Sequence, residues 1–161
     1  MPDWDGRRTA RVRHIRAASA KLRSVKPHRD RHLNWAEGFR ALRAVLPAAE
    51  GFAPDELPPL SPDGWSPLAI SGRSDVEVAR DLWTLVAKPA SGPLVVVTFA
   101  SFAQQLGPFF VQAESLDELI DAHPESTGDS FFSGDVLIVS EGEKSVIVVH
   151  HEELVGCYRA S

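Results

Sequence analysis

The segment Leu94–Phe99 reads Leu-Val-Val-Val-Thr-Phe, and it constrains the fold more than any other part of the chain. All but one of its residues are apolar, and most are β-branched or aromatic, which favours an extended strand. A strand that lacks polar alternation has to be covered on both faces. The segment therefore predicts the centre of a sheet with other elements packed on either side.

Helix starts are predicted by capping-box pairs, in which Ser or Asn is followed three residues later by Glu. Prolines further along mark the expected helix ends, because proline cannot donate to the preceding turn. The pairs are Asn34 with Glu37, Ser74 with Glu77 and Ser115 with Glu118, and the expected ends are Pro47, Pro89 and Pro124. Three helices are therefore expected around the sheet.

Two further apolar runs, Val136–Ser140 and Ser145–His150, are separated by a short polar link, Glu141–Lys144. Runs of this length and spacing predict an antiparallel hairpin. Another strand is expected at Phe109–Ala113. Strands that alternate with helices predict an α+β fold with a mixed sheet, flanking helices and an antiparallel hairpin at its C-terminal edge.

Charge is distributed unevenly along the 161 residues. Residues 1–50 contain 12 Lys or Arg and 5 Asp or Glu, whereas residues 51–161 contain 5 and 17. Apolar residues also recur at helical spacing across residues 12–25. These patterns predict a basic helical arm over 1–46, a proline-rich linker over 47–65 and an acidic α/β body over 66–161.

Several classes of protein are disfavoured by what the sequence lacks. Its longest apolar run spans six residues, whereas a membrane-spanning helix needs about 18. No glycine-rich phosphate-binding motif occurs, so no nucleotide cofactor is expected. Cys157 is the only cysteine, which excludes an intrachain disulfide and suits the reducing cytoplasm.

The densest set of potential metal ligands is His150-His151-Glu152-Glu153, at the end of the last predicted strand. Adjacent residues on a strand point to opposite faces of the sheet. We therefore expect that His150 and His151 do not share a metal unless the strand has already turned, and the sequence predicts no metal site.

A small hydrolase is one competing hypothesis. Gly128–Phe131 reads Gly-Asp-Ser-Phe, which resembles the opening block of GDSL-type esterases, with Ser130 as nucleophile. In that family the block lies near the start of the chain and a D-x-x-H block follows, whereas this sequence has neither arrangement. A hydrolase would otherwise have to use the pair His150 and His151.

Nucleic-acid binding is a second competing hypothesis, because the N-terminal segment has no acidic residue between Gly6 and His28. Eight basic side chains there could neutralise phosphates, with affinity that falls as salt rises. They are Arg7, Arg8, Arg11, Arg13, Arg16, Lys21, Arg23 and Lys26. The acidic body would oppose this interaction.

Protein binding is the leading hypothesis. An acidic surface attracts a basic partner over long range, and aromatic side chains can anchor it in a pocket. The candidate contacts are Asp117, Glu118, Asp121, Asp129, Glu152 and Glu153, with Phe131 and Phe132 as anchors. No catalytic residue is assigned under this hypothesis.

The segment Phe109–Ile120, which contains the phrase ESLDELI, resembles the strand-then-helix phrase of small bacterial immunity proteins, including the SUKH group. Immunity proteins protect a cell from a toxin by binding it. The resemblance therefore implies a non-enzymatic, antitoxin-like role with a basic toxin as the partner. The arginine-rich N-terminal segment departs from the usual pattern of these proteins.

Overall fold

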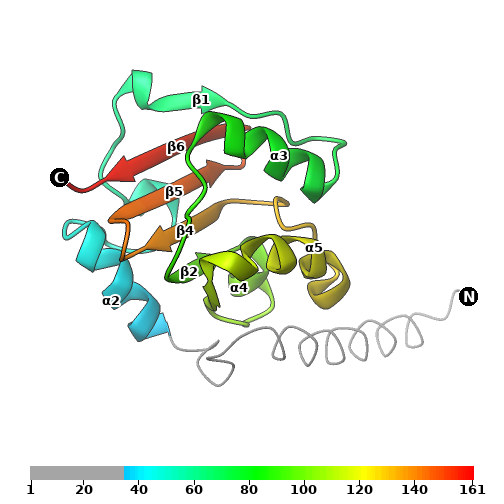
Figure 1. Cartoon of the computed structure of the whole chain (residues 1–161), viewed down its shortest axis with the longest axis horizontal. Helices are drawn as coiled ribbons and strands as arrows, with labels where there is room; N and C mark the ends of the chain where they lie inside the picture. The colour runs from blue at the N-terminus through cyan, green and yellow to red at the C-terminus, as the bar shows by residue number, and fades with distance from the viewer. Residues whose placement is uncertain (1–34) are drawn as a thin grey trace, which may run out of the picture.

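The structure is a computed structural model that describes residues 35–161, and it has the α+β fold expected from the sequence. Six strands form one sheet in the order β1-β6-β5-β4-β2-β3 (Figure 1). The strands are β1 (Trp65–Pro67), β2 (Pro93–Val97), β3 (Phe109–Gln112), β4 (Val136–Ser140), β5 (Ser145–His150) and β6 (Leu154–Arg159). The hairpin predicted at Val136–Ser140 and Ser145–His150 is confirmed as β4 and β5. Its expected place at the edge of the sheet is wrong, because β6 and β1 add beyond β5 and the hairpin lies in the middle.

Every pairing in the sheet is antiparallel, so the expectation of a mixed sheet is wrong. The helix α5 (Leu116–Thr127) does connect two strands that run in the same direction, β3 and β4. However, β2 lies between them and pairs antiparallel with both. In this split β-α-β arrangement, β3 and β4 run in the same direction and are joined by a helix, but they are not neighbours in the sheet.

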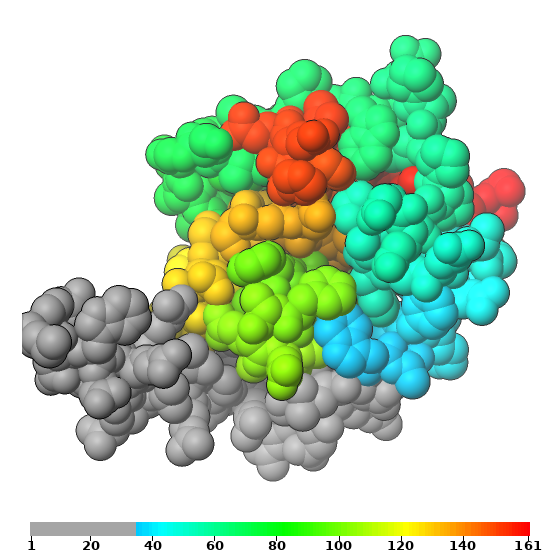
Figure 2. Space-filling view, turned by 180° about the vertical axis from the view of Figure 1, so that it is seen from behind, coloured from blue at the N-terminus to red at the C-terminus, as the bar shows by residue number. Residues whose placement is uncertain are grey.

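Helices cover both faces of the sheet. On one face α3 (Asp75–Leu85) and α5 pack over strand residues such as Val96 and Ile138. On the other face α2 (Trp35–Val45) packs over the alternate strand residues, such as Val95 and Val139. Viewed from behind, α2 lies beside the short helix α4 (Phe99–Ala103) (Figure 2). Coverage of both faces explains why β2 is apolar at consecutive positions.

The division predicted between an arm (1–46), a linker (47–65) and a body (66–161) does not match the packing of residues 35–65. Leu42 of α2 is fully buried, and Phe52 and Leu57 from the proline-rich segment pack in the same core cluster. Trp65, the last residue of the predicted linker, begins β1. Residues 35–65 therefore belong to the body, while residues 1–34 of the arm predicted over 1–46 lie outside the described part of the chain.

The strand predicted at Leu94–Phe99 is β2, which lies beside the edge strand β3 and not at the centre of the sheet. It is also shorter than predicted, because β2 ends at Val97 and Phe99 begins α4. The Thr98 N–H donates to the Ser101 hydroxyl at 3.0 Å, which starts the helical turn. As a result Phe99 is half exposed. Phe102 of the same helix stacks on the Trp35 ring of α2, with ring centroids 4.8 Å apart.

The helix α5 continues past Pro124, its expected end, to Thr127. The turn after the proline is held by the Thr127 hydroxyl, which donates to the His123 carbonyl at 2.9 Å, and by the Gly128 N–H, which donates to the Pro124 carbonyl. Gly128 then adopts a positive φ of 78° and ends the helix. The helix therefore depends on its C-cap rather than on the proline for its length.

The C-terminal segment around Cys157, where the sequence analysis expects no strand, forms β6. This strand pairs with β5 on one side and with β1 on the other. A Cβ atom at Gly156 would lie 2.2 Å from a Leu60 methyl group and 3.3 Å from the Gly64 carbonyl, so glycine permits this close approach. Cys157 is half-buried in the strand, and burial raises the pKa of its thiol.

Candidate functional site

The eight predicted contact residues do not form one surface. Asp117, Glu118 and Asp121 lie on α5, whereas Asp129 follows that helix and Glu152 and Glu153 belong to the turn between β5 and β6. The structure therefore brings together only the three acids of α5.

The predicted anchors Phe131 and Phe132 are 0% and 3% exposed, so they are core residues and cannot enter a partner's pocket. The buried carboxylate of Asp75 holds their loop in place. It accepts the backbone N–H groups of Phe131 at 2.8 Å and Phe132 at 3.3 Å, together with the Ser130 hydroxyl. This loop turns its aromatic rings inward, where they pack in the core beneath α3 and α5.

Two other predicted contacts are occupied within the chain. The Asp129 carboxylate accepts a hydrogen bond from the Gln104 side-chain amide at 2.7 Å. The Glu153 carboxylate accepts the backbone N–H groups of Ser71 at 2.6 Å and Ile70 at 2.9 Å, and these bonds lower the pKa of Glu153. Both acids stabilise local structure.

The Ser130 hydroxyl lacks the partner that a nucleophile requires. It donates to Asp75, and no hydrogen bond among residues 35–161 joins it to a histidine. The buried imidazole of His123 is hydrogen-bonded at both nitrogens, to the Thr98 hydroxyl at 2.9 Å and to the Asp129 carbonyl at 3.0 Å. A serine without an adjacent base does not support the hydrolase hypothesis.

Two of the three acids of α5, Asp117 and Asp121, line a groove of about 370 Å³ between α3 and α5. Apolar side chains from both helices form its floor, and charged side chains form its rims. The lining residues are Val76, Ala79, Arg80 and Trp83 from α3 and Asp117, Ile120 and Asp121 from α5. Asp117 and Asp121 are four positions apart on the helix, so both carboxylates lie along the same rim.

The apolar floor reaches the surface. Val76 is 49% exposed, which is unusual for a residue of an apolar helical stripe, and Trp83 is half-buried. The ammonium group of Lys88 lies 5.9 Å from the centre of a Trp83 ring and forms an ion pair with Asp117. One end of the groove is therefore already bordered by a cation that lies over an aromatic ring.

The two helices that form the groove are strongly acidic, with seven Asp or Glu and a single basic residue, Arg80. Asp81 is paired with Arg73 at 2.7 Å, next to the helix. In contrast, no ion pair reaches Glu118 or Asp121 from the residues that the structure describes. These two carboxylates are available to an incoming cation.

Val76, Ala79 and Trp83 recur at the spacing of an apolar helical stripe, a pattern typical of a helix that faces the core. The sheet covers only part of this stripe, so Val76 and Trp83 remain at the edge of the covered area. An apolar stripe wider than the sheet covers is the sequence feature that could have indicated a groove. The partner helix could not be identified from the sequence.

No protein-family model matches this chain, and no curated protein or solved structure matches it either. Within residues 35–161, no helix is long and apolar enough to cross a membrane. The geometry and charge of the groove are therefore the basis for assigning a function.

Proposed function

We propose that this chain is a binding protein that captures a basic, amphipathic segment of a protein partner in the groove between α3 and α5. The observation that carries the proposal is the combination of a surface-exposed apolar floor with an acidic rim. A groove of this kind suits an amphipathic helix, whose apolar side chains enter the floor while its Lys and Arg side chains meet the carboxylates.

The chemistry of each part of the groove supports a different step of binding. Exposed carboxylates such as Glu118 and Asp121 attract a basic partner and raise the association rate. Apolar burial against Val76 and Trp83 slows dissociation, because buried aromatic and aliphatic contacts dominate the binding energy of interfaces. The partner should therefore be recognised by charge and retained by apolar contact.

The finer proposal is an immunity or antitoxin-like role, in which the basic partner is a toxin. The phrase that resembles the immunity proteins contains Asp117 and Ile120, which line the groove, and Glu118, which follows Asp117 on the same helix. Binding of a basic, substrate-recognising surface would neutralise such a toxin without catalysis. The single, half-buried cysteine is compatible with the cytoplasm, the location that we propose.

The test compares three versions of the full chain as bait in lysate of the native host. These are the unmodified chain, a groove variant with Asp117, Glu118 and Asp121 changed to Lys, and a control variant with Glu50, Asp55 and Asp63 changed to Lys. The control acids are exposed and lie outside the two helices. Each variant replaces three acids with Lys, so both change the net charge by the same amount. We expect one basic protein that the unmodified and control chains retain and that the groove variant loses.

Equal retention by all three baits would contradict the proposal. Loss of the partner from both variants would show that net charge, rather than the groove, determines binding. Capture of nucleic acid instead of protein would favour the competing hypothesis, in which Arg7 to Lys26 contact phosphates.

A further inference from the structure

Two histidines lie side by side where β5 ends. The strand stops at His150, and the next residues form a tight turn in which the Glu153 N–H donates to the His150 carbonyl at 3.0 Å. His151 therefore does not continue the alternation of the strand. Its ring stacks on the His150 ring, with centroids 4.3 Å apart and planes at 26°. The chain has turned, which is the condition under which adjacent histidines can face one ligand.

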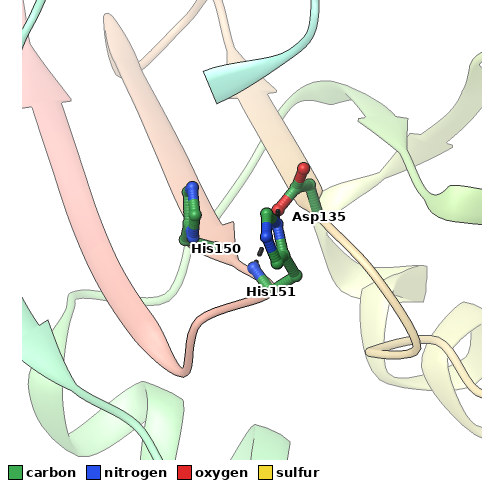
Figure 3. A group of neighbouring side chains, drawn as sticks. All are labelled: Asp135, His150 and His151. Atoms are coloured by element: carbon green, nitrogen blue, oxygen red, sulfur yellow. Dashed lines mark hydrogen bonds and ion pairs between the residues drawn. The ribbon is translucent and has the colours of Figure 1, made fainter. Parts of the chain in front are cut away.

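A carboxylate lies next to the stacked rings. Asp135 immediately precedes β4, and its Oδ1 accepts the His151 backbone N–H at 2.7 Å and bonds to His151 Nδ1 at 2.8 Å (Figure 3). This interaction raises the pKa of the imidazole. One ligand atom from each of Asp135, His150 and His151 lies within 4.8 Å of the others. Three potential metal ligands from two strand ends are thus gathered in one place.

The turn that presents the histidines is fixed to the rest of the fold. The Glu153 carbonyl accepts the Leu68 N–H at 2.8 Å, in addition to the bonds between its carboxylate and the N–H groups of Ile70 and Ser71. Glu153 itself has a positive φ of 62°, which the surrounding bonds maintain. The positions of the two histidines are therefore set by the backbone, so the cost of gathering the ligands is reduced.

The cluster is open to solvent and flanked by negative charge. The side chains of His151 and Asp135 are 60% and 32% exposed. Glu152 contributes a second carboxylate, whose Oε2 lies 3.8 Å from His150 Nδ1. A hydrated cation can reach these groups, and two carboxylates favour a divalent one.

We propose that Asp135, His150 and His151 form a binding site for a zinc ion. Imidazole nitrogens with one carboxylate oxygen are a ligand set typical of zinc, whereas calcium and magnesium prefer oxygen ligands throughout. In a tetrahedral zinc site the ligand atoms are about 3.3 Å apart. The three ligand atoms lie within 4.8 Å of one another, so zinc binding requires only small movements. The exposed His151 ring would exchange its bond to Asp135 for the metal, with Glu152 or water in the fourth position.

This site lies on the ends of β4 and β5, so its existence does not depend on the proposed function of the groove. The test titrates Zn²⁺ into the full chain, stripped of metal with EDTA and then dialysed, by isothermal titration calorimetry. A variant with His150→Ala and His151→Ala removes the proposed site. The matched control changes His14, His28 and His32 to Ala, because these histidines could bind zinc elsewhere in the chain.

We expect one Zn²⁺ per chain at this site, retained by the control and lost by the double variant. Asp135→Asn should weaken zinc binding about tenfold or more, the effect typical of a residue that holds or orients a ligand, whereas Asp63→Asn should not. Ring-nitrogen NMR signals of His150 and His151 should shift with zinc, while the buried His123 signal stays in place. Zinc binding that survives the double variant, or that disappears in the histidine control, would overturn the proposal, as would no binding to the unmodified chain.

Discussion

The buried carboxylate of Asp75 gives the strongest prediction for stability. Asp75→Ala removes the acceptor of the Phe131 and Phe132 N–H groups and of the Ser130 hydroxyl. Each buried N–H left without an acceptor costs ~1–3 kcal/mol, and loss of a hydrogen bond to a charged group adds ~1.5–3 kcal/mol. Part of this cost is offset because a charge no longer has to be buried. We expect the free energy of unfolding to fall by about 3–5 kcal/mol.

Urea unfolding, followed by tryptophan fluorescence and circular dichroism, measures this loss. Asp81→Ala is the matched control from the same helix, because its carboxylate is about half exposed and its ion pair with Arg73 should contribute only ~1 kcal/mol. Asp75→Asn should fall between the two, since its amide retains one oxygen acceptor. A decrease below about 1 kcal/mol for Asp75→Ala, with an unchanged urea dependence, would refute the role of Asp75 in holding the loop.

Three further predictions concern the surface and the titratable groups. Changing Asp117, Glu118 and Asp121 to Lys should slow association with the basic partner about tenfold at low salt, and stopped-flow rates should converge at 1 M salt, where the Debye length is ~3 Å; a rate that does not depend on these charges would exclude the acidic rim. The Ser74 N–H and hydroxyl groups lower the pKa of Glu77, so its contribution to stability is present at neutral pH and is lost as pH falls through the folded-state pKa. The stability difference between the unmodified chain and Glu77→Gln should therefore shrink in acid, and urea unfolding at several pH values would reveal a constant difference if this is wrong. Cys157 should react slowly with Ellman's reagent in the folded chain and rapidly in urea, because burial raises its pKa; equal rates would contradict its place in β6.

Local patterns predicted the elements that form by local interactions. The β4–β5 hairpin was correctly placed because both runs are rich in Val and Ile and their link is short, with Ser140 opposite Ser145. In contrast, β6 contains Gly156 and few β-branched residues, so its sequence did not indicate a strand. It becomes one because β5 and β1 both pair with it, and those contacts are distant in sequence.

The candidate site was predictable only in part, for the same reason. Asp117 and Asp121 are four positions apart on the helix predicted after Ser115, and this spacing is enough to place them on one side of it. The other wall of the groove belongs to α3, and no local signal places it beside α5. Phe131 and Phe132 were expected to be exposed because they lie in a polar loop, but Asp75, more than 50 residues earlier, turns that loop inward.

The pairing of β1 with β6 also determines when the sheet is completed during folding. Trp65 lies opposite Gly156, so about 90 residues separate the two strands in sequence, and closing a loop of that length has a high entropic cost. The β4–β5 hairpin, by contrast, closes a very short loop. Strands with such distant partners form slowly, which raises the contact order of the whole domain. The sheet should therefore grow outward from the hairpin, and β1, which places Trp65 against His150, should be among the last strands to join.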